Sequence, residues 1–201
     1  MGGICRKMRN FVVRDVKTKK KITMATKRIP YGISDFRRIA EENYYYVDKT
    51  RFIERVEQAP PFLFLIRPRR FGKSLWLAIL ELYYDIATRD DFDKLFGNLH
   101  IGRHPTSERN SYLILKFNFA AVNPEMDALN ESFEEHAANC FDDFNMKYRD
   151  LLGEGYLEGY LQRPNAESRL EYIGNWCKRA NLPIYLIIDE YDNFTNVVLS
   201  R

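Results

Sequence analysis

The sequence contains few cysteines and no long apolar run, and both shortages narrow the class of protein. Its three cysteines, Cys5, Cys140 and Cys177, are odd in number and widely separated, and none lies in a C-x-x-C pair. This spacing predicts neither a disulfide framework nor a zinc site, and it is typical of unreactive thiols in a reducing compartment. Every apolar run is far shorter than the roughly 18 residues that a membrane span requires, and Phe11–Val13 is too brief for a signal-peptide core. We therefore expect a cytoplasmic protein without a membrane segment.

Histidine is also scarce, and internal repeats are lacking. His100, His104 and His136 have neither metal-ligand spacing nor a cluster of cysteines or acids around them, so we assign them no metal. The 201 residues are 45% apolar and 14% aromatic, which is an ordinary balance for one globular domain with a substantial core.

Acidic residues are almost absent from the first 28 positions. That segment holds ten basic side chains and only one acid, Asp15, whereas residues 29–201 hold 21 basic and 27 acidic residues. The net charge of +3 therefore comes from the N-terminal segment. We expect residues 1–28 to form a disordered, solvated tail, with electrostatic contact to nucleic acid or anionic lipid as the alternative. Met24 would also serve as a start, a hypothesis under which residues 1–23 are not native.

Three apolar runs are expected to form strands, with helices between them. Phe62–Ile66 and Ile184–Ile188 are apolar throughout, which is typical of parallel strands covered on both faces, and Tyr112–Phe117 is a third candidate. Strands separated by helices predict an α/β fold, with a parallel sheet flanked by helices. The expected helices run from a Ser34 cap to Asn43, after an Asp48 cap, beyond Lys73, from Asn123 through Tyr148, and from an Asn165 cap to Ala180.

A phosphate-binding loop is predicted between the first strand and the helix that follows it. A bound triphosphate requires backbone amides at a helix N-terminus, a side-chain cation and an oxygen ligand for magnesium. Gly72 would let the backbone approach a phosphate, Lys73 would reach the β- and γ-phosphates, and Ser74 would coordinate magnesium. The run departs from G-x-x-x-x-G-K-[ST] at its start, where Arg67 replaces the first glycine. The Gly-Lys-Ser tripeptide alone is therefore a modest signal.

An acidic pair after the last predicted strand strengthens this interpretation. Hydrolysis of a triphosphate requires a carboxylate in the magnesium shell and a base that activates the attacking water. Asp189 and Glu190 follow Ile184–Ile188, so we expect them at the carboxyl edge of the sheet beside Lys73. We assign Asp189 to the metal, and Glu190 to catalysis together with Lys73. A solvated loop is the alternative for the acidic pair taken alone.

Four ordered motifs resemble the bacterial AAA-ATPase-like domain family. They are Ile29-Pro-Tyr-Gly-Ile-Ser-Asp-Phe36, Tyr44-Tyr-Tyr-Val-Asp-Lys-Thr50, Ile66-Arg-Pro-Arg-Arg-Phe-Gly-Lys-Ser74 and Leu186-Ile-Ile-Asp-Glu-Tyr-Asp192. The resemblance covers about residues 25–201, and in this family the arginine-rich form of the phosphate loop is usual. It implies a P-loop NTPase-type sheet that binds ATP and Mg²⁺. The nucleotide-binding set is then Arg69, Arg70, Phe71, Gly72, Lys73, Ser74 and Leu75, with Ser74 and Asp189 on the metal.

Some choices stay open within this resemblance. Arg69 and Arg70 either add charge beside the phosphates or pair with acids elsewhere in the domain. The tyrosines of Tyr44–Thr50 are expected in the core, with contact to a nucleotide base as the alternative. The residues themselves do not distinguish ATP from GTP.

The resemblance also implies segments that this sequence lacks. Proteins of the family commonly continue into a nuclease-like domain of the PD-(D/E)XK type, and in related P-loop ATPases a further strand separates the acidic-pair strand from the phosphate-loop strand. We therefore predict a fragment with two unpaired apolar strand edges, open to self-association or a protein partner. ATP hydrolysis is the leading function. The alternatives are a nucleotide-binding module without turnover, and a nucleic-acid-associated protein acting through its basic tail and a missing nuclease-like domain.

Overall fold

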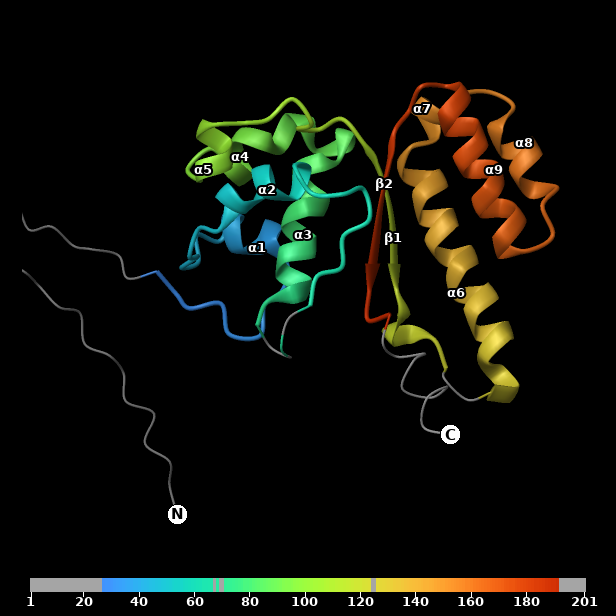
Figure 1. Ribbon diagram of the computed structural model, residues 1–201, viewed down its shortest axis with the longest axis horizontal. Coiled ribbons are helices and arrows are strands. Elements are labelled where there is room, and N and C mark those ends of the chain that lie inside the picture. Colours follow the sequence, from blue (N-terminus) through green and yellow to red (C-terminus); the bar gives the residue numbers. More distant parts are fainter. Residues whose placement is uncertain (1–26, 67, 69–70, 124–125, 192–201) are drawn as a thin grey trace, which may run out of the picture.

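A two-stranded parallel sheet lies at the centre of the computed structural model, which describes residues 27–66, 68, 71–123 and 126–191 (Figure 1). Strand β1 is Leu113–Asn118 and strand β2 is Ile184–Asp189. Their register pairs Leu113 with Ile184 and Asn118 with Asp189. The α/β class predicted from the sequence is confirmed at this coarse level. Residues 1–26 of the predicted tail lie outside the described residues.

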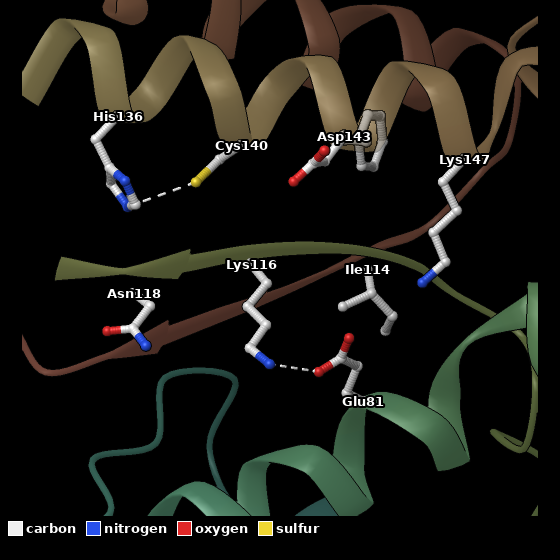
Figure 2. A pocket seen from close by; sticks show the side chains of 9 residues that line it. Glu81, Ile114, Lys116, Asn118, His136, Cys140, Asp143 and Lys147 are labelled. Carbon is white, nitrogen blue, oxygen red and sulfur yellow. Dashed lines mark hydrogen bonds and ion pairs between the residues drawn. The ribbon is translucent and has the colours of Figure 1, made fainter. Parts of the chain in front are cut away.

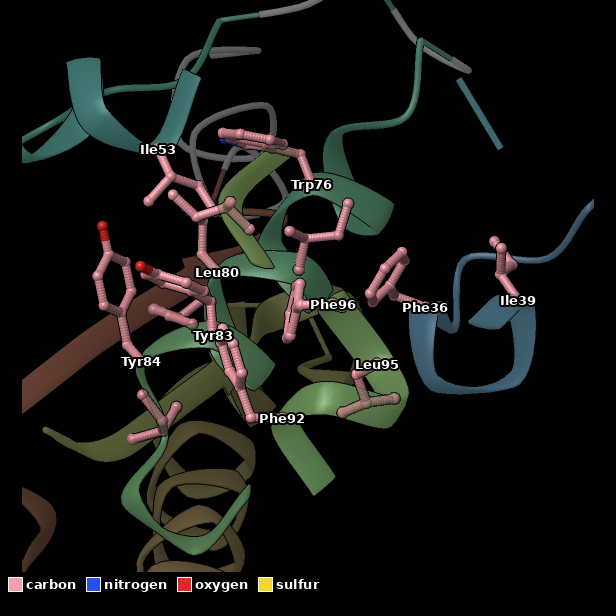
Figure 3. Packing of buried hydrophobic residues seen from close by; sticks show 14 of the residues in the cluster. Phe36, Ile39, Ile53, Trp76, Leu80, Tyr83, Tyr84, Phe92, Leu95 and Phe96 are labelled. Carbon is pink, nitrogen blue, oxygen red and sulfur yellow. The ribbon is translucent and has the colours of Figure 1, made fainter. Parts of the chain in front are cut away.

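The first group of helices packs on one face of the sheet. It consists of α1 (Phe36–Glu41), α2 (Ile53–Glu57), α3 (Lys73–Tyr84), α4 (Phe92–Phe96) and α5 (His100–Arg103), with 3-10 turns at Thr50–Phe52 and Ile86–Asp91. Figure 3 shows the core that these helices share. The ring of Phe96 lies 5.4 Å from that of Phe36 and 5.6 Å from that of Tyr83, between centroids. Burying a large apolar side chain of this kind contributes about 1.5–3 kcal/mol, so the core holds α3 firmly in place.

The second group of helices packs on the opposite face. It consists of α6 (Met126–Lys147), α7 (Arg149–Leu152), α8 (Tyr156–Leu161) and α9 (Ala166–Arg179), after a 3-10 turn at Phe119–Ala121. Side chains alternate along β1, so that Leu113 and Leu115 enter this core while Ile114 enters the first. None of the helices in the described part of the chain combines the length and the apolar character that crossing a bilayer demands.

The prediction of a strand at Phe62–Ile66 is wrong, because the structure contains no strand there. Phe62, Phe64 and Ile66 face solvent, at 88%, 75% and 84% exposed, whereas Leu65 packs against the first core. An apolar run becomes a strand only where a neighbouring strand takes its backbone hydrogen bonds. Within the described residues, β1 and β2 pair with each other, and the one further bridge joins Asp85 to Tyr112. The described sheet is therefore not the larger P-loop NTPase-type sheet that the family resemblance implied.

Two predicted helix caps also need correction. Asp35, and not Ser34, precedes α1 as its cap, and its side chain accepts from the Arg38 N–H at 3.2 Å. Asp48 does not cap α2, because its carboxylate bonds to Thr50 in the preceding 3-10 turn. The Asn165 cap is confirmed, and it forms a full capping box with the third residue of α9.

Candidate functional site

Helix α3 begins directly after a glycine in a left-handed conformation. Gly72 has φ +75°, and it supplies no side-chain acceptor to the amides of the first turn. A Cβ at this position would meet no heavy atom within 4 Å, so the backbone angle, and not crowding, favours glycine here. The first-turn amides of this 12-residue helix point out of its N-terminus, at the positive end of the helix dipole. This end of α3 is therefore suited to a phosphate group.

The side chain of Lys73 contacts the two carboxylates that the sequence predicted beside it. Its Nζ atom lies 3.1 Å from Asp189 Oδ1 and 3.4 Å from Glu190 Oε1. The Asp189 side chain is only 6% exposed, and that of Lys73 is 24% exposed. Burial lowers the pKa of the Lys73 ammonium, but the hydrogen bond and the charges of the two acids outweigh burial, so the pKa is raised. Three of the predicted site residues, from distant parts of the chain, thus form one cluster.

Glu190 leaves β2 through an unusual backbone turn. Its φ of +53° lies in the left-handed region, which costs a residue with a side chain about 1–2 kcal/mol. The turn places the Glu190 N–H 2.9 Å from Asp189 Oδ1, to which it donates, and brings the Glu190 carboxylate to Lys73. Strained backbone of this kind is common where a site requires a particular geometry.

A hollow of about 640 Å³ adjoins this cluster. Sequence analysis missed three of the residues that line it, namely Arg37, Lys116 and Asn118. Asn118 ends β1 in register with Asp189, so the rule that ligands bind at the carboxyl edge of parallel strands would have indicated it. Both cations are already paired, Arg37 with Asp91 and Lys116 with Glu81, each at 2.6 Å. The full lining is Ser34, Asp35, Arg37, Ser74, Ala78, Glu81, Leu82, Lys116, Asn118, Ala120, Asp189 and Glu190.

A second, smaller hollow of about 240 Å³ lies between α3, β1 and α6 (Figure 2). It shares Glu81, Lys116 and Asn118 with the first hollow, and no residue of the phosphate loop lines it. His136 Nε2 and Cys140 Sγ lie 3.5 Å apart in this hollow. Burial raises the pKa of the Cys140 thiol, so the thiolate is disfavoured, as expected for an unreactive cysteine.

The side chains around the start of α3 fit a magnesium–nucleotide complex by their chemistry. Ser74 and Asp189 both line the larger hollow and offer hydroxyl and carboxylate oxygens. Mg²⁺ in nucleotide sites is bound by one or two such oxygens together with phosphate oxygens and water. Across residues 27–191, apart from the undescribed positions, no three His, Cys, Asp or Glu side chains are placed to hold a metal on their own. Phosphate oxygens would therefore have to complete the metal shell.

The remaining predicted nucleotide contacts have mixed outcomes. Arg69 and Arg70 lie outside the described residues, so their role stays a prediction. Phe71 is 67% exposed beside the loop, whereas Leu75 is partly buried and packs against the first core. Tyr44 is buried in that core and Tyr46 packs against it, whereas Tyr45 is 56% exposed, so the expected core position is wrong for Tyr45.

Comparison with known proteins places this chain in a family. A protein of Azotobacter chroococcum mcd 1, described as an uncharacterised protein in the vnfD 5′ region, is 39% identical to it over 108 residues. That similarity covers 52% of this chain and only 20% of the relative, so the chain matches about a fifth of the relative's length. No solved structure matches the chain. A family model described as a predicted AAA-ATPase matches residues 30–201, and since this is most of the sequence, the chain belongs to the AAA-ATPase-like family.

Proposed function

We propose that this domain binds ATP with Mg²⁺ at the N-terminus of α3 and hydrolyses it. The observation that carries the proposal is the convergence of Lys73, Asp189 and Glu190 beside the glycine-capped end of α3. A lysine and two carboxylates at a helix N-terminus are the groups that triphosphate hydrolysis requires. Membership of the AAA-ATPase-like family supports the same function.

Each residue of the cluster has a role that follows from its chemistry. The first-turn amides of α3 donate hydrogen bonds to phosphate oxygens, and the Lys73 ammonium pairs with the β- and γ-phosphates. Ser74 and Asp189 would hold Mg²⁺, which would supply positive charge to neutralise the phosphate oxygens. Glu190 accepts a proton from the attacking water, whose oxygen bonds to the γ-phosphorus as the bond to the bridging oxygen breaks. The bridging oxygen leaves with ADP, and the water oxygen leaves in inorganic phosphate.

Replacing Glu190 by Gln separates binding from hydrolysis. We expect Glu190→Gln to reduce phosphate release by about 100-fold or more, because the amide is a poor proton acceptor. Binding of a fluorescent ATP analogue should change by no more than about threefold, since Glu190 acts on water and not on the nucleotide. Parallel titrations with a GTP analogue establish the base preference. A wild-type chain that binds neither analogue contradicts the proposal, and one that binds ATP without releasing phosphate is a nucleotide-binding module.

A further inference from the structure

The charged groups of the proposed site satisfy one another in the structure. Asp189 Oδ1 lies 3.1 Å from the Lys73 ammonium and accepts from the Glu190 N–H at 2.9 Å. Glu190 Oε1 lies 3.4 Å from the same ammonium. The proposed metal-binding carboxylate, base and phosphate-binding cation therefore form one ion cluster among the described residues.

We propose that Lys73 acts as a latch, which keeps divalent cations off Asp189 and Glu190 until a triphosphate draws its ammonium away. The latch rests on the proposed nucleotide site and adds an order of events to it. Phosphate reaches Lys73 before the metal or together with it, and the metal alone is held off.

Electrostatics supports this order. The ammonium contacts both carboxylates, so a divalent cation that approaches them meets like-charge repulsion at short range. The Asp189 side chain is 6% exposed, so water and salt screen this repulsion less than they would at an open surface. Phosphate oxygens reverse the balance, because they form strong charge-assisted hydrogen bonds to the ammonium and bring negative charge of their own.

Binding of Mn²⁺ alone to the full chain tests the latch, with the free-ion signal followed by electron paramagnetic resonance. We expect Lys73→Met to bind Mn²⁺ about tenfold more tightly than wild type, because the repelling charge is gone. Lys94→Met is the matched control, since Lys94 pairs with Glu41 at 2.9 Å on the surface, and it should leave Mn²⁺ affinity unchanged. Adding Asp189→Asn to Lys73→Met should abolish the gain.

Equal Mn²⁺ affinity in wild type and Lys73→Met overturns the latch. An equal gain in Lys94→Met also overturns it, because overall charge would then explain the effect. Lys73→Gln provides a second neutral replacement if circular dichroism shows that the Met variant does not fold. The proposed function is tested separately, because the Mn²⁺ titration contains no nucleotide. The proposed function fails when the wild-type chain binds no ATP or GTP analogue.

Discussion

Asp48 is a single carboxylate that joins two segments far apart in the chain. Its Oδ1 accepts from the Thr50 N–H at 2.8 Å and from the Thr50 hydroxyl at 2.7 Å. Its Oδ2 accepts from the His100 N–H at 2.7 Å, at the start of α5. Burial raises the pKa of Asp48, but the hydrogen bonds from Thr50 and His100 outweigh it, so the pKa is lowered.

Replacing Asp48 by Asn should destabilise the domain by about 1 kcal/mol at neutral pH, a modest value because the carboxylate is partly exposed. A lowered folded-state pKa means that the stabilisation is present above the unfolded-state pKa and is lost as pH falls through the folded-state pKa. The gap in unfolding free energy between wild type and Asp48→Asn should therefore narrow below about pH 4. Urea denaturation at neutral and acidic pH measures it, and a gap that does not change with pH contradicts this origin.

Gly72 is a second position, besides Glu190, where backbone conformation bears directly on the proposed site. Gly72→Ala should cost about 1 kcal/mol of stability, because alanine is strained at φ +75° although its Cβ has space. The same change should weaken binding of an ATP analogue. Gly174→Ala in α9 is the control, since it also has space, and it should stabilise the domain by about 0.5–1 kcal/mol. Thermal unfolding of both variants measures the change in stability, and titration with the ATP analogue measures the change in binding.

At the scale of elements, one tyrosine joins α3, β1 and α6. Asp85 follows α3 and is fully buried. Its Oδ1 accepts from the Tyr148 hydroxyl at 2.8 Å, and its Oδ2 lies 2.5 Å from Lys147 Nζ. The Tyr148 hydroxyl in turn accepts from the Ile114 N–H at 2.9 Å. The C-terminal end of α3 is therefore fixed to the end of α6.

Removing the Tyr148 hydroxyl should show how much this junction contributes to the free energy of unfolding. Tyr148→Phe leaves the buried Ile114 N–H without its acceptor. It also removes one of the two donors to Asp85 Oδ1, which keeps the Ala87 N–H at 2.9 Å, so we expect a loss of about 1–3 kcal/mol. Tyr160→Phe is the matched control, because both rings are 1% exposed but the Tyr160 hydroxyl makes a longer bond, at 3.4 Å to Asp142. Chemical denaturation should show the larger loss for Tyr148→Phe. Equal losses of unfolding free energy in the two variants would mean that the Tyr148 junction stabilises the domain no more than the Tyr160 bond does.

Elements with a strong local pattern could be predicted from the sequence, and those that depend on distant partners could not. The apolar stripe of α6 and the Asn165 capping box of α9 are local signals, and both helices were predicted. Phe62–Ile66 carries the composition of a strand, but pairing decides strand formation and composition does not reveal a partner. Lys73, Asp189 and Glu190 were predicted because each belongs to a chemical motif. Arg37 and Lys116 belong to none, and only folding places them at the hollow.

On the scale of the whole molecule, an apolar surface flanks the sheet. Leu186 and Ile188 of β2 are 49% and 43% exposed, and Phe64 lies with its ring 6.3 Å from that of Tyr191. An apolar strand edge without lysine or proline lacks the usual protection against pairing with another chain. This surface therefore favours association with a second copy of the chain.

Placing a charge on the exposed side of β2 should therefore reduce self-association of the chain. We expect Leu186→Lys to lower the average mass measured by light scattering at a given concentration, because the charge blocks edge pairing. Leu170→Lys on α9 is the control, since Leu170 is 41% exposed, close to the 49% of Leu186, and lies away from the strand edge. A wild-type chain that stays monomeric at high concentration contradicts the prediction.

The two paired strands are separated in sequence by the whole of α6 to α9, and this separation governs the order in which the molecule folds. Parallel strands cannot be joined by a tight turn, so a long loop must close before their first hydrogen bond forms. Contacts between distant positions form slowly, whereas helices gain most of their bonds locally. We therefore expect the helical segment between the strands to condense before β2 docks on β1. On this order we expect Asp189 to reach Lys73 late in folding, so that a newly made chain acquires its proposed nucleotide site after the helices between the strands have formed.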